Sequence, residues 1–297
     1  MRSELAPHRF LGLLAIVVAG SFSPPCAHAQ SKLAMGSNRS PRTVRKIPAV
    51  DRELAQQHPL WPTLELAVKS YQHIRKDIKD YSCTVVRRER VHGVLQDFEY
   101  MQAKVRHGRT RGGGVVVPFS VYVKFLAPAH ANGREVLYVT GRNDGEMFVR
   151  KGGLRFSFVT TRLHPHSDLA MQGNRHPVTE FGFENLIKRL IEVVKEEIAL
   201  GTDCEVEFFH QAKVDGRNCT GVRVSHPTYD SRLRFYSTSV FVDNEMNVPI
   251  HYEAYDWPDQ KDGQPVLLEQ YTYRNIRLNV GFTNADFEPT NPNYRLR

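Results

Sequence analysis

Cysteine is scarce in this chain, and so are the signatures of the common enzyme classes. Only four of the 297 residues are cysteine, and no Cys-x-x-Cys pair occurs, which argues against a dithiol redox site. No Gly-x-Ser-x-Gly nucleophile elbow is present. Three glycines at 112–114 predict a mobile loop, and they lack the Lys-Ser or Lys-Thr of a nucleotide-binding loop. We therefore predict that the protein is not an enzyme and has no cofactor.

Long hydrophobic runs are also missing beyond the N-terminus, so no transmembrane segment is predicted in the mature chain. The N-terminus has Arg2 and Arg9, an apolar run at 10–19 and a small-x-small motif at 27–29. This order is typical of a secretory signal peptide over 1–29, cleaved before Gln30. It predicts an exported, periplasmic protein. An uncleaved anchor or a lipid-modified Cys26 are the alternatives.

The formal charge of +8 is spread along the chain without a nucleic-acid-binding motif, so nucleic acid is not a predicted partner. Residues 30–58 are polar and basic and are predicted to be a flexible leader. A role of this leader at a membrane surface or with a partner stays open. No domain boundary is visible within 59–297, which we interpret as a single domain. It ends in a predicted tail with Phe287 as its only clear anchor.

Three cysteines remain after the signal peptide. Cys204 and Cys219 flank a hairpin whose turn is Asp215-Gly216. In this register Cys219 lies opposite Ala212, so the two cysteines are too far apart for a disulfide. Either Cys83 bridges to one of them, or all three are small buried hydrophobic residues.

Hydrophobic periodicity predicts two helices, each followed by strands. Apolar residues recur every three or four positions over 62–81, with Pro62 in the first turn, and again over 183–198. Alternation then places Cys83 and Val85 on one strand face, and residues 87–90 are expected to make cross-strand ion pairs. Five further strands are predicted at 203–211, 218–226, 231–243, 248–256 and 265–278. The order predicts an α+β fold, a large and strongly curved antiparallel sheet of about ten strands with two helices on its concave side.

The stretch "PFSVYVKFLAP" at 118–128 is a strand bounded by prolines. One face is wholly apolar and carries Phe119, Val121, Val123 and Phe125, whereas the other is mixed. Further aromatic residues gather in the same half of the chain. Such a surface either packs into a solid core or lines a cavity, and periodicity alone allows both.

Histidines supply the weak metal candidates. His164, His166 and His176 lie within one irregular segment and are typical zinc or copper ligands. His251 and Glu253 share a strand face, which is also the ordinary appearance of a polar sheet surface. We therefore keep a histidine-based metal protein only as a second alternative, with no metal site predicted.

Four stretches resemble the bacterial family known as domain of unknown function 1571: "DYSCTVVRRERVHG", "PFSVYVKFLAPAHANGREVLYV", "DLAMQGNRHPVTEFGFENL" and "VPIHYEAYDWP". The resemblance covers about residues 60–296. The family has no established activity, but its pattern is similar to that of the periplasmic lipoprotein carriers of the LolA and LppX type and of the MucB-type sensors. It implies an eleven-stranded unclosed barrel, helices over the open side and an apolar cavity.

The resemblance implies a carrier or sensor that binds an acyl chain, a lipid or a lipidated protein. The alternative is an envelope interaction or scaffold module with a packed barrel. The residues implied to line the cavity are Phe98, Tyr100, Phe119, Val121, Val123, Phe125, Phe183, Leu186 and Leu190. Their number does not distinguish a filled interior from a hollow one.

Overall fold

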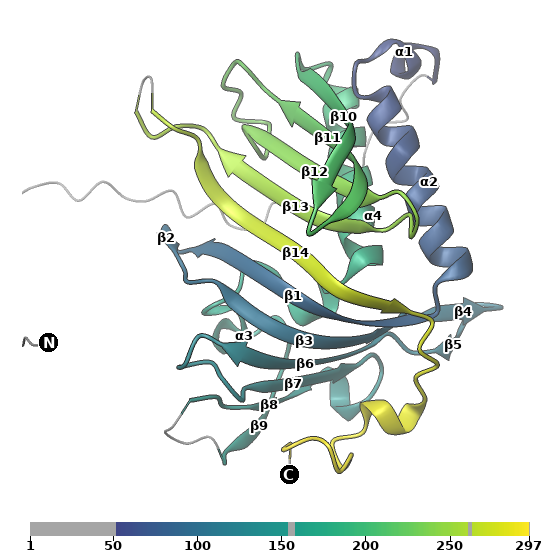
Figure 1. Cartoon of the computed structure of the whole chain (residues 1–297), viewed down its shortest axis with the longest axis vertical. Helices are drawn as coiled ribbons and strands as arrows, with labels where there is room; N and C mark the ends of the chain where they lie inside the picture. The colour runs from purple at the N-terminus through teal and green to yellow at the C-terminus, as the bar shows by residue number, and fades with distance from the viewer. Residues whose placement is uncertain (1–51, 154–157, 261–262, 297) are drawn as a thin grey trace, which may run out of the picture. The chain divides into compact units, whose positions relative to one another are not determined.

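The structure is a computed structural model that describes residues 52–153, 158–260 and 263–296 (Figure 1). The predicted signal peptide and most of the predicted leader lie outside the described residues. The end of that leader forms a short helix, α1 (Arg52–Gln57), and its Ala55 is buried. Helix α1 therefore falls within the last residues of the predicted leader, 30–58.

Both predicted helices are confirmed. Helix α2 (Trp61–Asp77) has Pro62 in its first turn, and α4 (Phe183–Leu200) ends at Gly201, whose φ of 61° is the left-handed value that favours glycine. The strands are β1 (Asp80–Val91), β2 (Val94–Leu95), β3 (Glu99–Arg106), β4 (Arg109–Arg111), β5 (Gly114–Val117), β6 (Ser120–Ala127), β7 (Glu135–Val139), β8 (Met147–Arg150), β9 (Thr160–Leu163), β10 (Glu205–Val214), β11 (Arg217–Ser225), β12 (Ser237–Asp243), β13 (Pro249–Asp256) and β14 (Val266–Leu278).

One antiparallel sheet dominates the described part of the chain. Its order is β10-β11-β12-β13-β14-β1-β3-β6-β7-β8-β9, with β2 paired to β1, which makes twelve strands. The two edges, β10 and β9, do not pair with each other, so the sheet is not closed. The predicted unclosed antiparallel sheet is thus confirmed. The last strand, β14, joins the first, β1, and links the two halves of the chain in the middle of the sheet (Figure 1).

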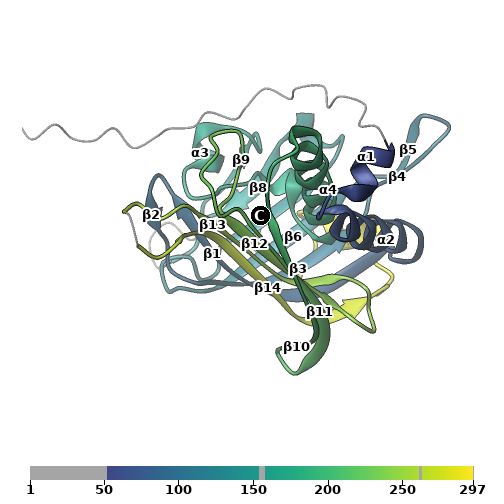
Figure 2. The same ribbon diagram turned by 90° about the horizontal axis from the view of Figure 1, so that it is seen from above.

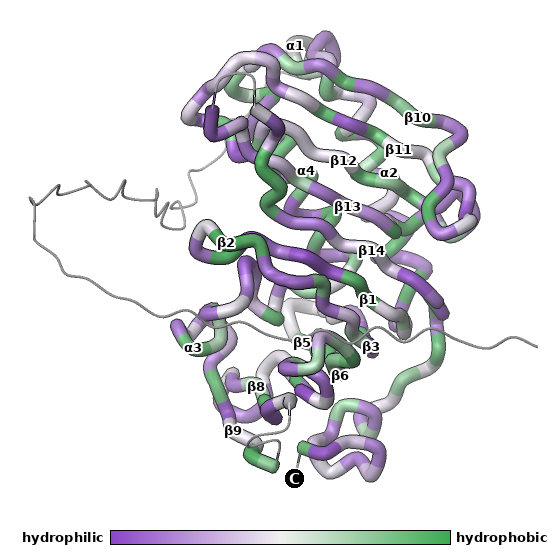
Figure 3. Tube along the Cα trace, turned by 60° about the vertical axis from the view of Figure 1, so that its left-hand side comes forward, coloured by the Kyte–Doolittle hydropathy of each residue, from purple (hydrophilic) through white to green (hydrophobic). Residues whose placement is uncertain are grey.

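Helices α2 and α4 lie against the same face of the sheet (Figure 2). Their apolar stripes pack with inward side chains of the strands into one hydrophobic core. Phe183 at the start of α4 is completely buried and stacks on Tyr81, with ring centroids 4.1 Å apart. Hydrophobic and hydrophilic residues are interspersed along β10 and β11 in Figure 3, as expected when only one face of a strand is buried.

Three local predictions need correction. The glycine-rich stretch predicted as a mobile loop forms the two-stranded hairpin β4–β5, because Gly112 and Gly113 supply the positive φ angles of a tight turn. The segment 160–182, predicted to be irregular, contains β9, the short helix α3 (Asp168–Met171) and a 3-10 turn, η2 (Val178–Glu180).

The third correction concerns the C-terminal tail, for which Phe287 was the only predicted anchor. Tyr294 and Leu296 are buried with it in a separate hydrophobic cluster. Tyr294 stacks on Tyr122, with ring centroids 3.7 Å apart. The tail thereby covers the face of β6 that the sequence indicated to be mixed, and Tyr122 is buried there.

The predicted register of the β10–β11 hairpin is confirmed. Val214 pairs with Arg217, and Ala212 pairs with Cys219. Cys83, Cys204 and Cys219 are all free thiols, with Cys83 and Cys219 buried. Burial raises the pKa of Cys83 well above its ordinary value, so this thiol is a packing residue and not a reactive one.

No helix in the described part of the chain is both long enough and apolar enough to cross a bilayer.

Candidate ligand-binding cavity

A cavity of about 460 Å³ lies within the curve of the sheet. Its walls come from β1, β3, β6, β7, β8, β9 and β14, from the first turns of α4 and from the segment 163–182. This volume falls in the range of about 300–1,000 Å³ that small-molecule sites occupy. The interior beside α4 is therefore incompletely filled.

The position of the cavity follows from what covers each half of the sheet. Long helices α2 and α4 bring apolar stripes onto the sheet and pack with it into a continuous core. Over β6 to β9 the cover is the segment 163–182, whose only helices are α3 and the turn η2. Short, partly polar elements bring few large side chains to the interior, so space remains beneath them.

Apolar side chains form one part of the lining. They project from the strands and from the first turns of α4, and include Val85, Met101, Val123, Phe125, Val136, Met147, Val149, Leu163, Leu186 and Tyr273. Met101 and Val123 are almost completely buried, so they belong to the deep part of the wall. This surface suits a hydrocarbon chain.

The structure divides the nine residues implied to line the cavity into three groups. Val123, Phe125 and Leu186 are in the lining. Val121, Phe183 and Leu190 are buried in the core and Phe119 packs against it, although none of the four is in the lining. Phe98 and Tyr100 are 42% and 40% exposed and lie outside the cavity.

The outward position of these two aromatic residues has a local reason. Strand β3 begins at Glu99, and its alternation puts Met101 inside and Tyr100 outside. Phe98 lies next to Arg88, whose guanidinium is 4.9 Å from the centre of the Phe98 ring. Aromatic content alone therefore indicated the wrong face for both residues.

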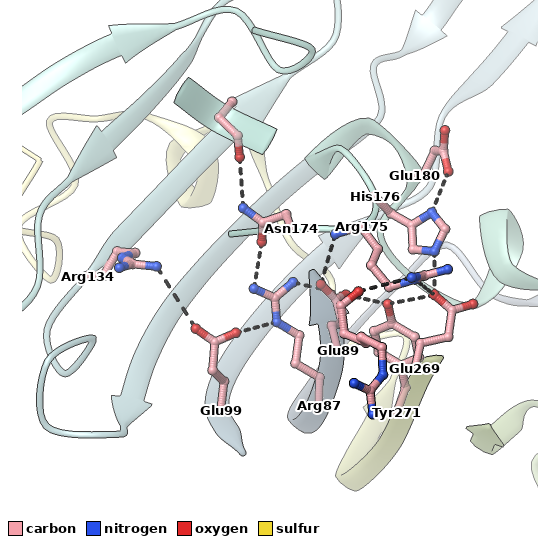
Figure 4. Close-up of polar contacts among 12 residues, drawn as sticks. Arg87, Glu89, Glu99, Arg134, Asn174, Arg175, His176, Glu180, Glu269 and Tyr271 are labelled. Atoms are coloured by element: carbon pink, nitrogen blue, oxygen red, sulfur yellow. Dashed lines mark hydrogen bonds and ion pairs between the residues drawn. The ribbon is translucent and has the colours of Figure 1, made fainter. Parts of the chain in front are cut away.

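Charged side chains form the other part of the lining (Figure 4). Arg87 on β1 donates from Nε to Glu99 Oε2 at 2.6 Å and from Nη2 to Asn174 Oδ1 at 2.6 Å. Glu89 accepts from the backbone N–H of Arg175 at 3.0 Å and from the hydroxyl of Tyr271. These bonds tie the segment 163–182 to the sheet.

Glu269 on β14 is the centre of a second group and is only 1% exposed. Its Oε2 lies 2.6 Å from His176 Nε2 and 3.3 Å from Arg175 Nε, and its Oε1 lies 3.5 Å from Arg189 Nη2. One buried carboxylate thus compensates three basic side chains from the covering segment and from α4 (Figure 4).

Burial and charge act in opposite directions on these groups. Burial by itself raises the pKa of Glu269, but the neighbouring charges of His176, Arg189 and Arg175 outweigh it, and the pKa lies below its ordinary value. Burial likewise lowers the pKa of His176, but the Glu269 carboxylate and hydrogen bonds to Glu180 and Glu269 outweigh it, so the pKa is raised. The protonated imidazole is favoured at this site.

Sequence reasoning missed the charged part of the lining, although a signal for it was present. The alternation that puts Val85 inside β1 continues to Arg87 and Glu89 on the same face. The sequence indicated cross-strand ion pairs for residues 87–90, and Arg87 does lie opposite Glu99 in the β1–β3 register. What was not predicted is that this pair faces the interior.

The three candidate metal histidines do not form a common site. His164 and His166 are neighbours, with ring centroids 5.7 Å apart, but the nitrogens of His176 face Glu269 and Glu180. Among the described residues no group of three or more His, Cys, Asp or Glu side chains is arranged to hold a metal ion. His251 donates to or accepts from Thr272 at 2.8 Å on β14, within an ordinary sheet surface.

Comparison with models of protein families assigns the chain to one family. The model of the family described as "Protein of unknown function (DUF1571)" matches residues 78–296, so the chain belongs to this family, as its motifs predicted. No curated protein matches the chain.

Solved structures with a similar arrangement come from other families. A putative outer membrane lipoprotein-sorting protein domain from Vibrio parahaemolyticus is 14% identical, with a TM-score of 0.35, covering 76% of this chain and 95% of that one. Mycobacterium tuberculosis lipoprotein LppX is 11% identical, with a TM-score of 0.39 and coverages of 75% and 98%. A DUF1329 family protein from Desulfovibrio piger is 15% identical, with a TM-score of 0.38 and coverages of 78% and 98%. At TM-scores this low, the cavity itself and not these likenesses carries the functional conclusion.

Proposed function

We propose that this member of the DUF1571 family is an exported, non-catalytic carrier or sensor that holds an acyl chain in its cavity. The observation that carries the proposal is the incompletely filled interior of about 460 Å³ with its apolar strand wall. The acyl chain belongs to a lipid or to a lipidated protein. Export follows from the N-terminal signal peptide pattern of the sequence.

The driving force is the removal of hydrocarbon from water. Each buried methylene contributes about 0.8 kcal/mol, and micromolar binding corresponds to about 8 kcal/mol. Burial of about ten methylenes is therefore enough for micromolar binding. The apolar lining, which includes Val123, Val136, Val149 and Leu163, offers contact to a chain of this length.

Two measurements test the proposal. Protein purified from the exported fraction is extracted with organic solvent, and the extract is analysed by mass spectrometry for lipids. Delipidated protein is then titrated with a neutral naphthylamine dye that fluoresces in apolar surroundings. We expect a co-purifying lipid and saturable dye binding that a fatty acid reverses.

A matched pair of variants locates the binding. Val136 lines the cavity, whereas Val206 is equally a partly buried strand valine that packs elsewhere against the core. Val136→Asp should weaken dye binding because it places a charge in the apolar wall, and Val206→Asp should leave binding unchanged in whatever fraction remains folded. Recovery of no lipid, together with no dye or fatty-acid uptake by the wild type, would refute the proposal.

The scaffold alternative requires a packed barrel. A void below about 300 Å³ would favour it, and the cavity of about 460 Å³ exceeds this value. The carrier or sensor is therefore the function that the geometry supports best.

A further inference from the structure

The charged part of the cavity lining is dominated by basic side chains. Arg87, Arg134, Lys151 and Arg189 are in the lining, together with His176, whereas its only carboxylates within the described part of the chain are Glu89 and Glu180. Glu89 and Glu180 pair with Arg87 and Arg189 at 3.4 and 3.9 Å, and the further partners of these two arginines, Glu99 and Glu269, are not in the lining. The wall therefore presents positive charge to the space inside.

Arg134 differs from the other basic residues in how little it is compensated. Among the described residues its guanidinium makes no hydrogen bond. Its ion-pair partner, Glu99, is 4.0 Å away and is already bound by Arg87 at 2.6 Å. Burial lowers the pKa of Arg134 and nearby Arg87 lowers it further, against the raising effect of Glu99. The Arg134 cation is therefore only weakly compensated, by a carboxylate that it shares with Arg87.

The backbone holds Arg134 beside the apolar wall. Arg134 lies in the turn between β6 and β7, where its carbonyl oxygen accepts from Phe125 N at 2.9 Å, and Phe125 O accepts from Gly133 N at 2.9 Å. The guanidinium is thereby placed 5.0 Å from the centre of the Phe125 ring, a residue of the lining. Its side chain is 35% exposed, whereas that of Arg87 is 11% exposed, so Arg134 stands nearer the solvent.

We infer that the cavity selects amphipathic molecules whose polar end is an oxyanion, a carboxylate or a phosphate, and that Arg134 binds this end. This inference rests on the proposed function, since it names the class of ligand for the same cavity. The hydrocarbon lies along Val123, Val136 and Val149, and the oxyanion accepts hydrogen bonds from the Arg134 guanidinium, whose pairing with Glu99 is weak. A free fatty acid and a lipid phosphate both supply this chemistry.

The test compares ligands that differ only in the head group. Dodecanol, dodecanoate, dodecyl phosphate and dodecyltrimethylammonium compete with the neutral naphthylamine dye for delipidated wild-type protein. A charge-assisted hydrogen bond contributes about ten- to hundredfold in affinity. At least one of the two anions, the one whose head group fits the site, should therefore bind about tenfold tighter than dodecanol or more. The cation should bind most weakly. The stronger of the two anions distinguishes the carboxylate source from the phosphate source.

Variants at Arg134 assign the effect to this residue. Arg134→Gln should abolish most of the anion preference while dodecanol affinity stays unchanged, which shows that the cavity is intact. Arg134→Lys should retain part of the preference. The control is Arg162→Gln on strand β9, since Arg162 is exposed, pairs with Glu146 and is not in the lining.

The outcomes separate this inference from the proposed function. Equal binding of all four head groups by the wild type would overturn the inference and leave the acyl-chain proposal standing. An anion preference that persists in Arg134→Gln would overturn the role of Arg134. Failure of every compound and of the dye to bind would refute the proposed function itself.

Discussion

Filling part of the cavity should shorten the acyl chain that it can hold. Val149 lies on β8 and lines the wall. The substitution Val149→Phe adds about four carbon atoms to a side chain that borders empty space. Because the space is already present, the larger ring should occupy it without displacing the core. We therefore expect a change in ligand length preference with little change in stability.

The size of the effect follows from the volume. A methylene occupies about as much space as a water molecule, roughly 30 Å³, so a cavity of about 460 Å³ holds on the order of fifteen. Each buried methylene contributes about 0.8 kcal/mol, which is about fourfold in Kd. Affinity should rise by this factor per carbon up to roughly fifteen carbons in the wild type and roughly eleven in Val149→Phe.

A series of straight-chain alcohols measures this limit, because alcohols carry no charge that interacts with the basic lining. Each alcohol competes with the neutral dye, and the chain length at which affinity stops rising is compared between proteins. Val206→Phe is the matched control, since Val206 packs against the core outside the cavity. The reasoning is refuted if the wild type and Val149→Phe reach their plateau at the same chain length.

Three further predictions concern stability. Phe183→Ala should lower the free energy of unfolding by about 3–5 kcal/mol in urea titrations, since Phe183 is completely buried. Glu269→Gln should lower the free energy of unfolding by about 3–5 kcal/mol, because it leaves Arg175 and His176 without their buried carboxylate. The pKa of His176 is raised in the folded protein. Its protonated side chain therefore stabilises the fold fully at pH values below the unfolded-state pKa of about 6.5, and this contribution is lost as pH rises through the folded-state pKa. The difference in stability between wild type and His176→Gln should therefore be larger at about pH 6 than at about pH 8.

Surface variants provide the comparison for these effects. Phe98→Ala and Glu207→Gln change exposed residues of the same types and should shift stability by less than about 0.5 kcal/mol. Equal losses for Phe98→Ala and Phe183→Ala would contradict the assigned core. A stability difference at His176 that does not vary with pH would contradict the ion pair with Glu269.

Local patterns predicted the elements of this fold well. Three- and four-residue spacing identified α2 and α4, and the Asp215-Gly216 turn gave the correct pairing of Ala212 with Cys219. Such features depend on backbone geometry within a few residues, and side chain spacing reports that geometry directly. The family motifs extended the prediction to an open sheet, since they identify a known strand order.

Long-range contacts escaped the same reasoning. Glu89 and Tyr271 are 182 residues apart in the chain and are hydrogen-bonded, and Tyr294 of the tail covers Tyr122 on β6. Periodicity assigned residues to faces without stating what lies opposite. It therefore left the interior position of the Arg87–Glu99 pair unrecognised, and aromatic content placed Phe98 and Tyr100 in the cavity although both are exposed.

The sequence by itself determined the helices, most strands, the open antiparallel sheet and an apolar face on residues 118–128. Only the tertiary structure decided that this face borders both a core and a cavity. Val121 packs in the core, and Val123 lines the cavity. The physical reason is that a cavity is space left between elements distant in sequence. Its existence depends on how completely α4 and the segment 163–182 fill the curve of the sheet, and no local pattern carries that information.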